Sequence, residues 1–387
     1  MMNGSDNVRI PIGACIRGCT SNGHTPLIVT FLSNDSKNAH LRLSAPTSDV
    51  DATILRWQDQ FYQFVITHHG YPATVAVEGQ SGLYGLGFSL DEAKSTEHIV
   101  IPKEASEQQR LRESLKGKVV VVTGGAQGFG EGIIRALVEE GCITFIADLN
   151  EDGARHLADE LNGRMGQTVA IPVRVDVTNE DSVEHMMEFV AQTTGCCDVF
   201  ISNAGVLKAG SVKELSLKDF QFVTSVDYTG FFICTKFASR LMAWQDKAAK
   251  GTYLTDIIAI SSKSGLEGSN RNGAYAGAKF GTIGLVQSFA LELVKDHIKV
   301  NAVCPGNFLE GPLWSDPVKG LFVQYLEAGK VPGAKTIEDV RRFYESKVPM
   351  GRGCTTTDVV RAICYIVEQK YETGQSLPVT GGQIMLH

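Results

Sequence analysis

The chain has 387 residues, of which 43% are hydrophobic and 20% are charged, a composition typical of a folded globular protein. Its formal net charge of -7 would repel nucleic acid and anionic membrane surfaces, so we expect neither as a partner. The first residues lack a basic stretch followed by an apolar core, which predicts no targeting peptide. Nine scattered cysteines match no metal-ligand spacing, so we expect reduced thiols, a cytoplasmic location and no bound metal.

Before Lys118 the chain has few clear elements, and we expect a small N-terminal α/β segment there. Its predicted strands are Pro26–Leu32 and Ala73–Val77, with a helix over Ala52–His68. The charged stretch Lys103–Lys118 lacks β-branched residues and indicates a solvated helix and linker. These patterns predict two parts, residues 1–115 and 116–387, with a boundary near Leu115 and no catalytic role for the first part.

From Lys118 onward, short runs rich in β-branched residues alternate with longer helical stretches, as in a parallel sheet whose strands are joined by helices. The runs are mostly apolar throughout, which suits strands covered on both faces. The expected strands are Val119–Thr123, Ile143–Ala147, Ala170–Val175, Val199–Ser202, Ile257–Ser261, Lys299–Cys304 and Ser376–Thr380. The sequence therefore predicts an α/β fold with a doubly wound parallel sheet in three layers.

The first of these strands runs into a glycine-rich turn, TGGAQGFG, and then a helix. Gly124, Gly128 and Gly130 allow a tight turn and a close approach of the backbone to a diphosphate, and Gln127 and Phe129 lie between them. The N–H groups that open the following helix attract a negative charge. Strand, turn and helix together predict a Rossmann-type dinucleotide site, in preference to a glycine turn without a ligand.

The second strand ends in Asp148, followed by Leu149, about 20 residues beyond the glycines. A carboxylate in this place accepts hydrogen bonds from the adenosine ribose and repels a phosphate on that ribose. No Arg or Lys lies between Asp148 and Asp152 to bind such a phosphate. We therefore expect NAD as the cofactor in preference to NADP.

Several further motifs follow in a fixed order: DVT at Asp176, NAG at Asn203, two serines at Ser261, YAGAK at Tyr275 and PG at Pro305. With the glycine turn, this series resembles the short-chain dehydrogenase/reductase family, from about Lys118 to the end of the chain. The resemblance implies an oxidoreductase that forms a homo-oligomer, most often a tetramer. It also implies a set of further cofactor contacts, namely Asp176, Val177, Asn203, Ala204, Gly205, Tyr275, Lys279 and Pro305.

The catalytic residues that the resemblance implies are Ser262, Tyr275 and Lys279. Tyr275 and Lys279 are four residues apart, so on a helix both side chains lie on one face. A tyrosine is almost wholly protonated at neutral pH, so the nearby ammonium favours the phenolate that proton transfer needs. Ser262 would orient the reacting oxygen. We choose it over Ser261 because Gly265 follows it at the family's spacing.

Asp227, in the segment DYTG, departs from the family's pattern, in which an Asn braces a proton path behind the lysine. We place Asp227 with the catalytic residues. An ionised Asp only accepts hydrogen bonds and adds negative charge near Lys279. The expected consequence is a higher pKa for both Lys279 and Tyr275, with an activity optimum at more alkaline pH.

The predicted substrate contacts are Lys208, Lys263, Arg271 and Asn307. Within the family, stretches such as SKSG at Ser262 and TGQS near the end are similar to those of sorbitol-6-phosphate 2-dehydrogenases. Each cation alone would normally be solvated. Together, beside the catalytic serine, Lys208, Lys263 and Arg271 suggest a phosphate site, and so a polyol or sugar phosphate substrate. We expect residues 310–344 to form a mobile lid over it.

Two other functions stay open, namely oxidation of an unphosphorylated sugar, sugar acid or lactaldehyde-like product, and an NAD-binding regulator with a decayed site. The stretch Tyr71–Ala93 resembles the end of the aldolase part in fused class II aldolase and dehydrogenase proteins. Such aldolases bind metal through histidines. The adjacent His68 and His69 would point opposite ways in an extended segment, which predicts no metal there.

Overall fold

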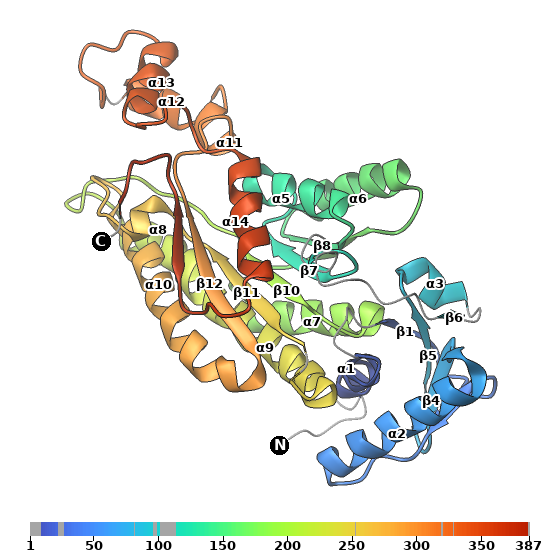
Figure 1. Cartoon of the computed structure of the whole chain (residues 1–387). Coiled ribbons are helices and arrows are strands. Elements are labelled where there is room, and N and C mark those ends of the chain that lie inside the picture. Colours follow the sequence, from blue (N-terminus) through green and yellow to red (C-terminus); the bar gives the residue numbers. More distant parts are fainter. Residues whose placement is uncertain are drawn as a thin grey trace.

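A computed structural model of the chain describes residues 9–21, 27–80, 82–95, 99–100, 114–251, 253–318, 320–327 and 329–385. At its centre is a seven-stranded sheet in the order β13-β12-β11-β10-β7-β8-β9, in which every neighbouring pair is parallel (Figure 1). The strands are β7 (Val119–Thr123), β8 (Ile143–Asp148), β9 (Ala170–Arg174), β10 (Val199–Ser202), β11 (Thr255–Ile260), β12 (Ile298–Pro305) and β13 (Ser376–Val379). All seven predicted strands are present, with ends that agree to within two residues.

Helices cover both faces of this sheet and give the predicted three layers. The side chains of Val119 and Val121 on β7 lie in one core with α7 (Glu180–Thr194), α9 (Gly230–Ala249) and α10 (Gly273–Leu293). Those of Val120 and Val122 lie in a second core with α5 (Gly128–Glu139), α6 (Glu151–Met165) and α14 (Thr356–Glu368). This alternation follows from the pleat of the strand, and it confirms the doubly wound Rossmann-type fold.

The strand order reverses between β7 and β10, and the ends of these strands receive the functional segments. Between β10 and α9 lie α8 (Leu217–Thr224) and a π-helical turn, η1 (Ser225–Thr229). Short 3-10 turns follow β11 at η2 (Lys263–Gly265) and precede β12 at η3 (Val294–Asp296). Ligands of open α/β sheets bind at the carboxyl ends of the strands near such a reversal.

The segment between β12 and α14 stands off this end of the sheet, at the top of Figure 1. It contains α11 (Pro312–Ser315), α12 (Leu321–Glu327) and α13 (Ile337–Ser346). A small apolar core of its own, the lid core, holds it together: Leu309, Trp314, Leu321, Phe322, Tyr325, Val331 and Val340. The position agrees with the lid predicted at residues 310–344, and the mobility of that lid stays a prediction.

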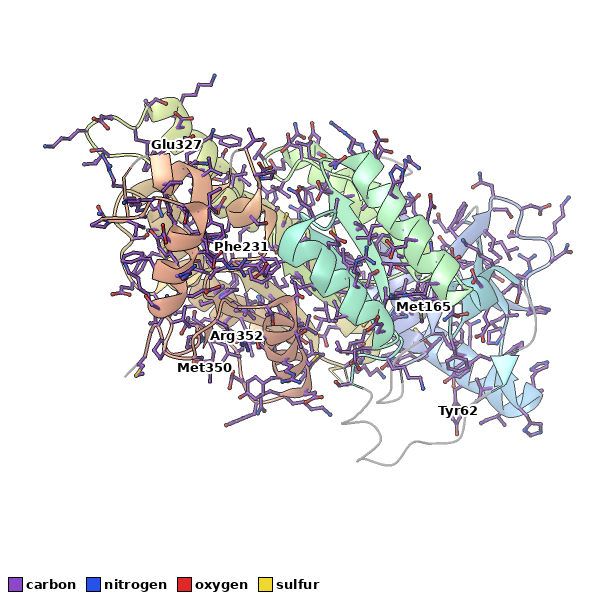
Figure 2. All side chains as sticks on the ribbon, turned by 90° about the horizontal axis from the view of Figure 1, so that it is seen from above. Tyr62, Met165, Phe231, Glu327, Met350 and Arg352 are labelled. Carbon is purple, nitrogen blue, oxygen red and sulfur yellow. The ribbon has the colours of Figure 1, made fainter. Side chains whose placement is uncertain are left out.

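The N-terminal segment lies at the other end of the molecule from the lid, as Figure 1 and the positions of Tyr62 and Glu327 in Figure 2 show. A four-stranded sheet, β1-β5-β4-β2, is its centre. The elements are α1 (Arg9–Cys19), β1 (Ile28–Ser33), β2 (Leu41–Leu43), α2 (Val50–His68), β3 (Gly70–Tyr71), β4 (Thr74–Val77), β5 (Leu83–Gly87), α3 (Leu90–Ser95) and β6 (Ile99–Val100). The predicted strands correspond to β1 and β4, and the predicted helix to α2.

The helix α1, which the sequence analysis did not predict, packs this segment against α7 and α9. A Cβ atom on Gly18 would lie 2.4 Å from the Cβ of Ala248, so only glycine allows this approach. Ala14 and Ile28 belong to the same core as α7 and α9. The two parts are therefore joined by a buried contact, while the boundary near Leu115 stays a prediction.

Three expectations about the N-terminal half need comment. Most of the predicted helix and linker at Lys103–Lys118 lies outside the described residues, of which 114–117 form a turn. The premise that His68 and His69 lie in an extended segment is wrong, because His68 ends α2 and His69 is its left-handed cap. Within the described ranges, no three His, Cys, Asp or Glu side chains gather as metal ligands, and no helix is long and apolar enough to cross a membrane.

Candidate active site

The glycine-rich turn between β7 and α5 has no room for side chains. Gly124 and Gly128 have φ values of 61° and 62°, which L-residues with a side chain rarely adopt. A Cβ atom on Gly130 would lie 2.0 Å from the carbonyl oxygen of Gly124. The side chain of Asn203 donates to the carbonyls of Thr123 and Gly124, at 2.9 and 3.0 Å, and so braces the turn from β10.

The N-terminus of α5, at the end of this turn, is open to an anion. Its N-cap residue Gln127 makes no side-chain hydrogen bond to the helix. The first N–H groups of a helix lack partners within it and carry a partial positive charge. Beside them, Phe129 stacks on Phe308, with ring centroids 4.3 Å apart. The turn therefore fits the diphosphate of a dinucleotide on steric and electrostatic grounds.

Asp148 ends β8 beside the glycine turn. Its carboxylate accepts hydrogen bonds from the N–H groups of Ala126 and Asn150, at 2.9 and 2.8 Å. These bonds fix the carboxylate and leave acceptor positions for ribose hydroxyls. Leu149 is 59% exposed next to it. The strand register pairs Asp148 with Arg174 on β9. This cation was not considered when NAD was predicted from the sequence.

The other predicted cofactor residues lie around the same strand ends. The carboxylate of Asp176 accepts from the N–H and hydroxyl of Thr178, at 2.9 and 2.7 Å. Val177 is buried and supports Gly230, the first residue of α9. Ala204 donates its N–H to the Thr123 hydroxyl, and Pro305 ends β12. The side chain of Val177 belongs to the core, and its predicted contact with the cofactor stays a prediction.

The helix α10 carries Tyr275 and Lys279, and Ser262 follows β11 directly opposite. Lys279 is 4% exposed; its Nζ donates to the carbonyl of Ile260 at 3.1 Å and lies 5.5 Å from the centre of the Tyr275 ring. The Ser262 hydroxyl accepts from the N–H of Ser264 at 3.1 Å and bonds to Tyr275. The other serine, Ser261, is buried and donates to the carbonyl of Lys279. The geometry thus agrees with the choice of Ser262.

Asp227 lies in the π-helical turn η1 and contacts this group from behind. Its Oδ2 is 3.2 Å from the Nζ of Lys279, and its Oδ1 accepts from the N–H of Val206 at 2.8 Å. Both charged side chains are buried. A Cβ on Gly205 would lie 3.2 Å from Asp227 and 3.4 Å from Lys279, so this glycine lets the β10 end approach the ion pair.

Burial and these charges set the acid strength of the site. Burial raises the pKa of Tyr275; the Lys279 ammonium opposes this rise and the Asp227 carboxylate adds to it. Burial alone would lower the pKa of Lys279, but Asp227 and Tyr275 outweigh it and raise that pKa. Asp227 therefore acts on both groups in the direction expected from the sequence. Without a ligand, Lys279 does not bring the pKa of Tyr275 below its ordinary value.

Of the predicted substrate contacts, Lys263 and Arg271 lie beside the catalytic group. Lys263 is the residue after Ser262 and begins η2. The carbonyl of Arg271, a residue with a φ of 60°, accepts a hydrogen bond from the N–H of Gly210. The segment after β10 that contains Lys208 therefore lies beside Arg271. Two further cations, not predicted from the sequence, lie near Lys263 and Arg271: the charge of Lys347 acts on Lys263, and the charges of Lys263 and Arg271 act on Lys330.

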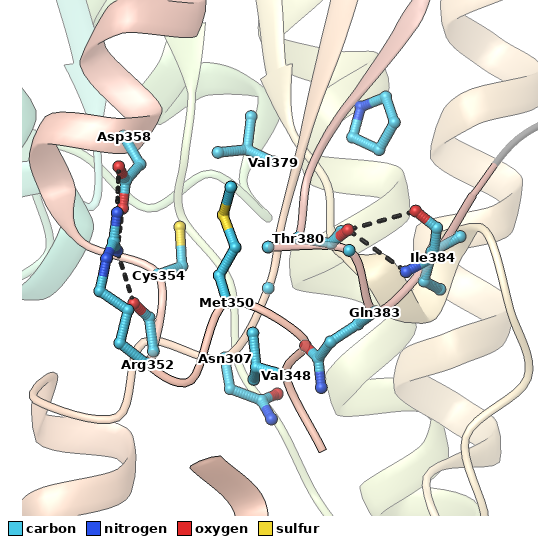
Figure 3. A pocket seen from close by; sticks show the side chains of 15 residues that line it. Asn307, Val348, Met350, Arg352, Cys354, Asp358, Val379, Thr380, Gln383 and Ile384 are labelled. Atoms are coloured by element: carbon cyan, nitrogen blue, oxygen red, sulfur yellow. Dashed lines mark hydrogen bonds and ion pairs between the residues drawn. The ribbon is translucent and has the colours of Figure 1, made fainter. Parts of the chain in front are cut away.

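Asn307 lines a cavity of about 290 Å³ where β12 and β13 end (Figure 3). The Arg352 guanidinium also lines it but is held by both carboxylate oxygens of Asp358, at 2.6 and 2.9 Å. Gln383, which the sequence analysis also missed, points its side chain into the cavity, and its buried Oε1 has no hydrogen-bond partner in the described part of the chain. Asn307 and Gln383 are thus the polar side chains available to a ligand here.

Comparisons with known proteins agree with this geometry. The family model described as short chain dehydrogenase matches residues 118–315. The chain is 36% identical to sorbitol-6-phosphate 2-dehydrogenase of Escherichia coli strain K12 over 270 residues, which is 69% of this chain and 99% of the relative. It is 30% identical to trans-4-hydroxycyclohexanecarboxylate dehydrogenase of Sinomonas cyclohexanicum, over 71% and 95% of the two chains.

A solved structure is also similar, that of sorbitol-6-phosphate 2-dehydrogenase from Erwinia amylovora, with a TM-score of 0.63 and 38% identity over 69% of this chain and 100% of that one. The family match begins at residue 118, so it gives no support to the aldolase resemblance of Tyr71–Ala93. Motif order, fold and relatives agree: the chain belongs to the short-chain dehydrogenase family and is an oxidoreductase that acts on CH–OH groups.

Proposed function

We propose that this protein is an NAD-dependent dehydrogenase of a polyol or sugar phosphate, which interconverts a secondary alcohol and a ketone. The observation that carries the proposal is the placement of Lys263, a cation, directly after the catalytic Ser262. An alcohol that reaches Ser262 and Tyr275 extends past this ammonium. The likeness to sorbitol-6-phosphate 2-dehydrogenases supports the same substrate class.

The proposed proton transfer uses the hydroxyl of Tyr275. In the oxidative direction its phenolate oxygen accepts the proton of the substrate hydroxyl, while Ser262 holds that hydroxyl by a hydrogen bond. Lys279 stabilises the phenolate by its charge, and Asp227 and the Ile260 carbonyl hold the ammonium in place. Nicotinamide, when bound, supplies the hydride acceptor. The turn at Gly124–Gly130 would hold its diphosphate, and Asp148 its adenosine ribose.

The choice of NAD over NADP rests on the Asp148 carboxylate, whose charge opposes a ribose phosphate. Arg174 in the neighbouring strand offers a competing attraction for that phosphate. Asp148→Ser is expected to reduce the ratio of kcat/KM for NAD to that for NADP by about tenfold or more. A tenfold change corresponds to about 1.4 kcal/mol of lost interaction with the carboxylate charge. An unchanged ratio would mean that another residue selects the cofactor.

The decisive experiment measures NADH formation with sorbitol 6-phosphate, sorbitol, other polyols, their phosphates and sugar acids. We expect the highest kcat/KM for a phosphorylated polyol, and a value lower by about a hundredfold or more for Tyr275→Phe. A preference for an unphosphorylated alcohol would contradict the substrate class. Retained NAD binding without turnover on any member of the panel would instead favour an NAD-binding regulator.

We also propose that the protein works as a homo-oligomer, with a tetramer as the favoured state. Large apolar side chains face outward on α9 and α10, among them Phe232 and Phe280, which are 45% and 46% exposed. Such side chains near one another mark interfaces. Light scattering coupled to size exclusion measures the mass of the particle, and a monomer would refute this part.

The nine unpaired cysteines support the cytoplasmic location proposed from the sequence.

A further inference from the structure

Four cations from four separate segments lie close enough for their charges to act on one another, and one of them, Lys263, directly follows Ser262. Lys263 follows Ser262 on η2, and Arg271 precedes α10. Lys330 follows α12 and Lys347 ends α13, so both belong to the lid. The charges of Arg271, Lys347 and Lys263 act together with burial to lower the pKa of Lys330. Burial, opposed by Glu267 and assisted by Lys347, likewise lowers the pKa of Lys263.

The lid holds Lys330 and Lys347 on aromatic faces. The Nζ of Lys330 lies 3.7 Å from the ring centre of Tyr325, and that of Lys347 lies 4.1 Å from Phe343. Tyr325 belongs to the lid core, where it meets Trp314 edge-on at 5.6 Å. Rings in these positions attract the ammonium groups and fix where they point. The cations are therefore positioned by the core of the lid.

Four acidic side chains of the lid are engaged elsewhere. Glu310 and Glu345 pair with Arg341, Glu338 pairs with Arg342, and Asp339 caps α13. Within the described ranges, none of the four cations forms an ion pair with a carboxylate. Glu267 acts on Lys263 without forming an ion pair with it. Four positive charges outweigh this single negative charge, and such an excess favours binding of an anion.

The contacts of the lid bring these charges over the catalytic group. Leu207, next to Lys208 at the end of β10, packs against the lid core. Gly210, three residues on, donates its N–H to the carbonyl of Arg271 at 2.8 Å. The lid, the segment after β10 and the start of α10, the helix that carries Tyr275, therefore meet at one place.

We propose that Lys263, Arg271, Lys330 and Lys347 bind the phosphate monoester of the substrate, and that this phosphate ties the lid to the body of the enzyme over the reacting carbon. The inference rests on the proposed function and deepens it. Lys330 and Lys347 are specificity residues that bind the phosphate from the lid. Lys263 and Arg271 bind it from the body of the enzyme. An unphosphorylated polyol lacks the anion that links the two sides.

The test compares kcat/KM for sorbitol 6-phosphate and for sorbitol in the wild type and in a Lys330→Gln, Lys347→Gln double variant. We expect the ratio of the two values to fall by about tenfold for each lysine, because contacts to a charged phosphate are strong. The fall should arise mainly from a lower kcat/KM for sorbitol 6-phosphate. The matched control is Lys335→Gln, an exposed lysine of the same lid whose charge does not act on Lys330.

A second readout follows the binding step itself. Calorimetric titration of sorbitol 6-phosphate into the Tyr275→Phe enzyme with NAD should show binding that the two lysine substitutions weaken. A wild-type enzyme that prefers sorbitol would overturn the proposed function together with this inference. A wild type that prefers sorbitol 6-phosphate, with the same preference in the double variant, would overturn the inference alone and leave the proposed function standing.

Discussion

The ion pair between Arg17 and Asp198 joins the N-terminal segment to the sheet, and its removal has a large predicted cost. Both side chains are 0% exposed, and the guanidinium lies 2.7 Å from the carboxylate. Arg17 also donates to the carbonyl of Leu27 at 2.7 Å. Asp198 accepts in addition from the N–H of Val119, at 2.8 Å, where β7 begins. The buried Arg17 on α1 thus holds the Asp198 carboxylate, which binds the start of β7 and directly precedes β10.

Arg17→Met keeps an apolar side chain of similar length and leaves the Asp198 carboxylate buried without its cation. Breaking a buried pair in this way costs about 3–5 kcal/mol. For a chain of 387 residues, an unfolding entropy of about 2.1 cal/mol/K per residue converts this into a fall in Tm of about 4–6 °C. Such a loss is a large share of the roughly 5–15 kcal/mol by which domains are stable.

The assay is thermal and urea unfolding of the wild type, Arg17→Met and the double variant Arg17→Met with Asp198→Asn. The double variant should regain part of the loss, because a neutral amide is less costly to bury than an unpaired carboxylate. Arg56→Met is the matched control: Arg56 is an exposed arginine of α2, so its loss should change stability by less than about 0.5 kcal/mol. Equal midpoints for Arg17→Met and Arg56→Met would refute the reasoning.

Three further predictions concern the active site. Asp227→Asn keeps an acceptor for the Val206 N–H but removes the charge that raises the pKa values of Lys279 and Tyr275. The rise of the oxidation rate with pH, which follows formation of the Tyr275 phenolate, should therefore move to lower pH. A pH profile identical to that of the wild type would show that the charge has no such role. Gly130→Ala places a Cβ 2.0 Å from the Gly124 carbonyl and should weaken NADH binding in fluorescence titrations, whereas Gly163→Ala, which meets open space, should not. Tyr275→Phe should lower kcat by about a hundredfold or more while NADH still binds, and a smaller loss would point to another proton acceptor.

The sheet and the catalytic group were predictable because their signals are local. Continuous apolar runs bounded by turns marked each central strand, and the YxxxK spacing placed two side chains on one helix face. The helix α1 was not predictable in the same way. Its sequence contains Pro11, Gly13 and Gly18, which disfavour helix, and it is stabilised by packing against α7 and α9, where Gly18 allows the close approach to Ala248.

The remaining parts of the site depend on contacts between distant segments. Lys330 and Lys347 come near Lys263 because the lid, more than sixty residues further along the chain, packs against the segment after β10, and no periodic pattern in the sequence indicates such a contact. The π-helical turn that presents Asp227 likewise has no sequence signature of its own, although such turns are frequent at functional sites. Gln383 is identified only by its unpartnered buried oxygen in the folded chain.

The packing of α1 also limits how two copies of the protein can meet. Gly18 lies against Gln245 and Ala248 in the last turns of α9, and Gln58 of α2 donates to the carbonyl of Ala248 at 2.6 Å. That end of α9 is therefore already covered by its own chain. A second copy that docks on α9 has only the opposite end to bind, where Phe232 faces outward. In the proposed oligomer, the N-terminal segment would therefore act as a spacer that limits the overlap of neighbouring subunits along this helix.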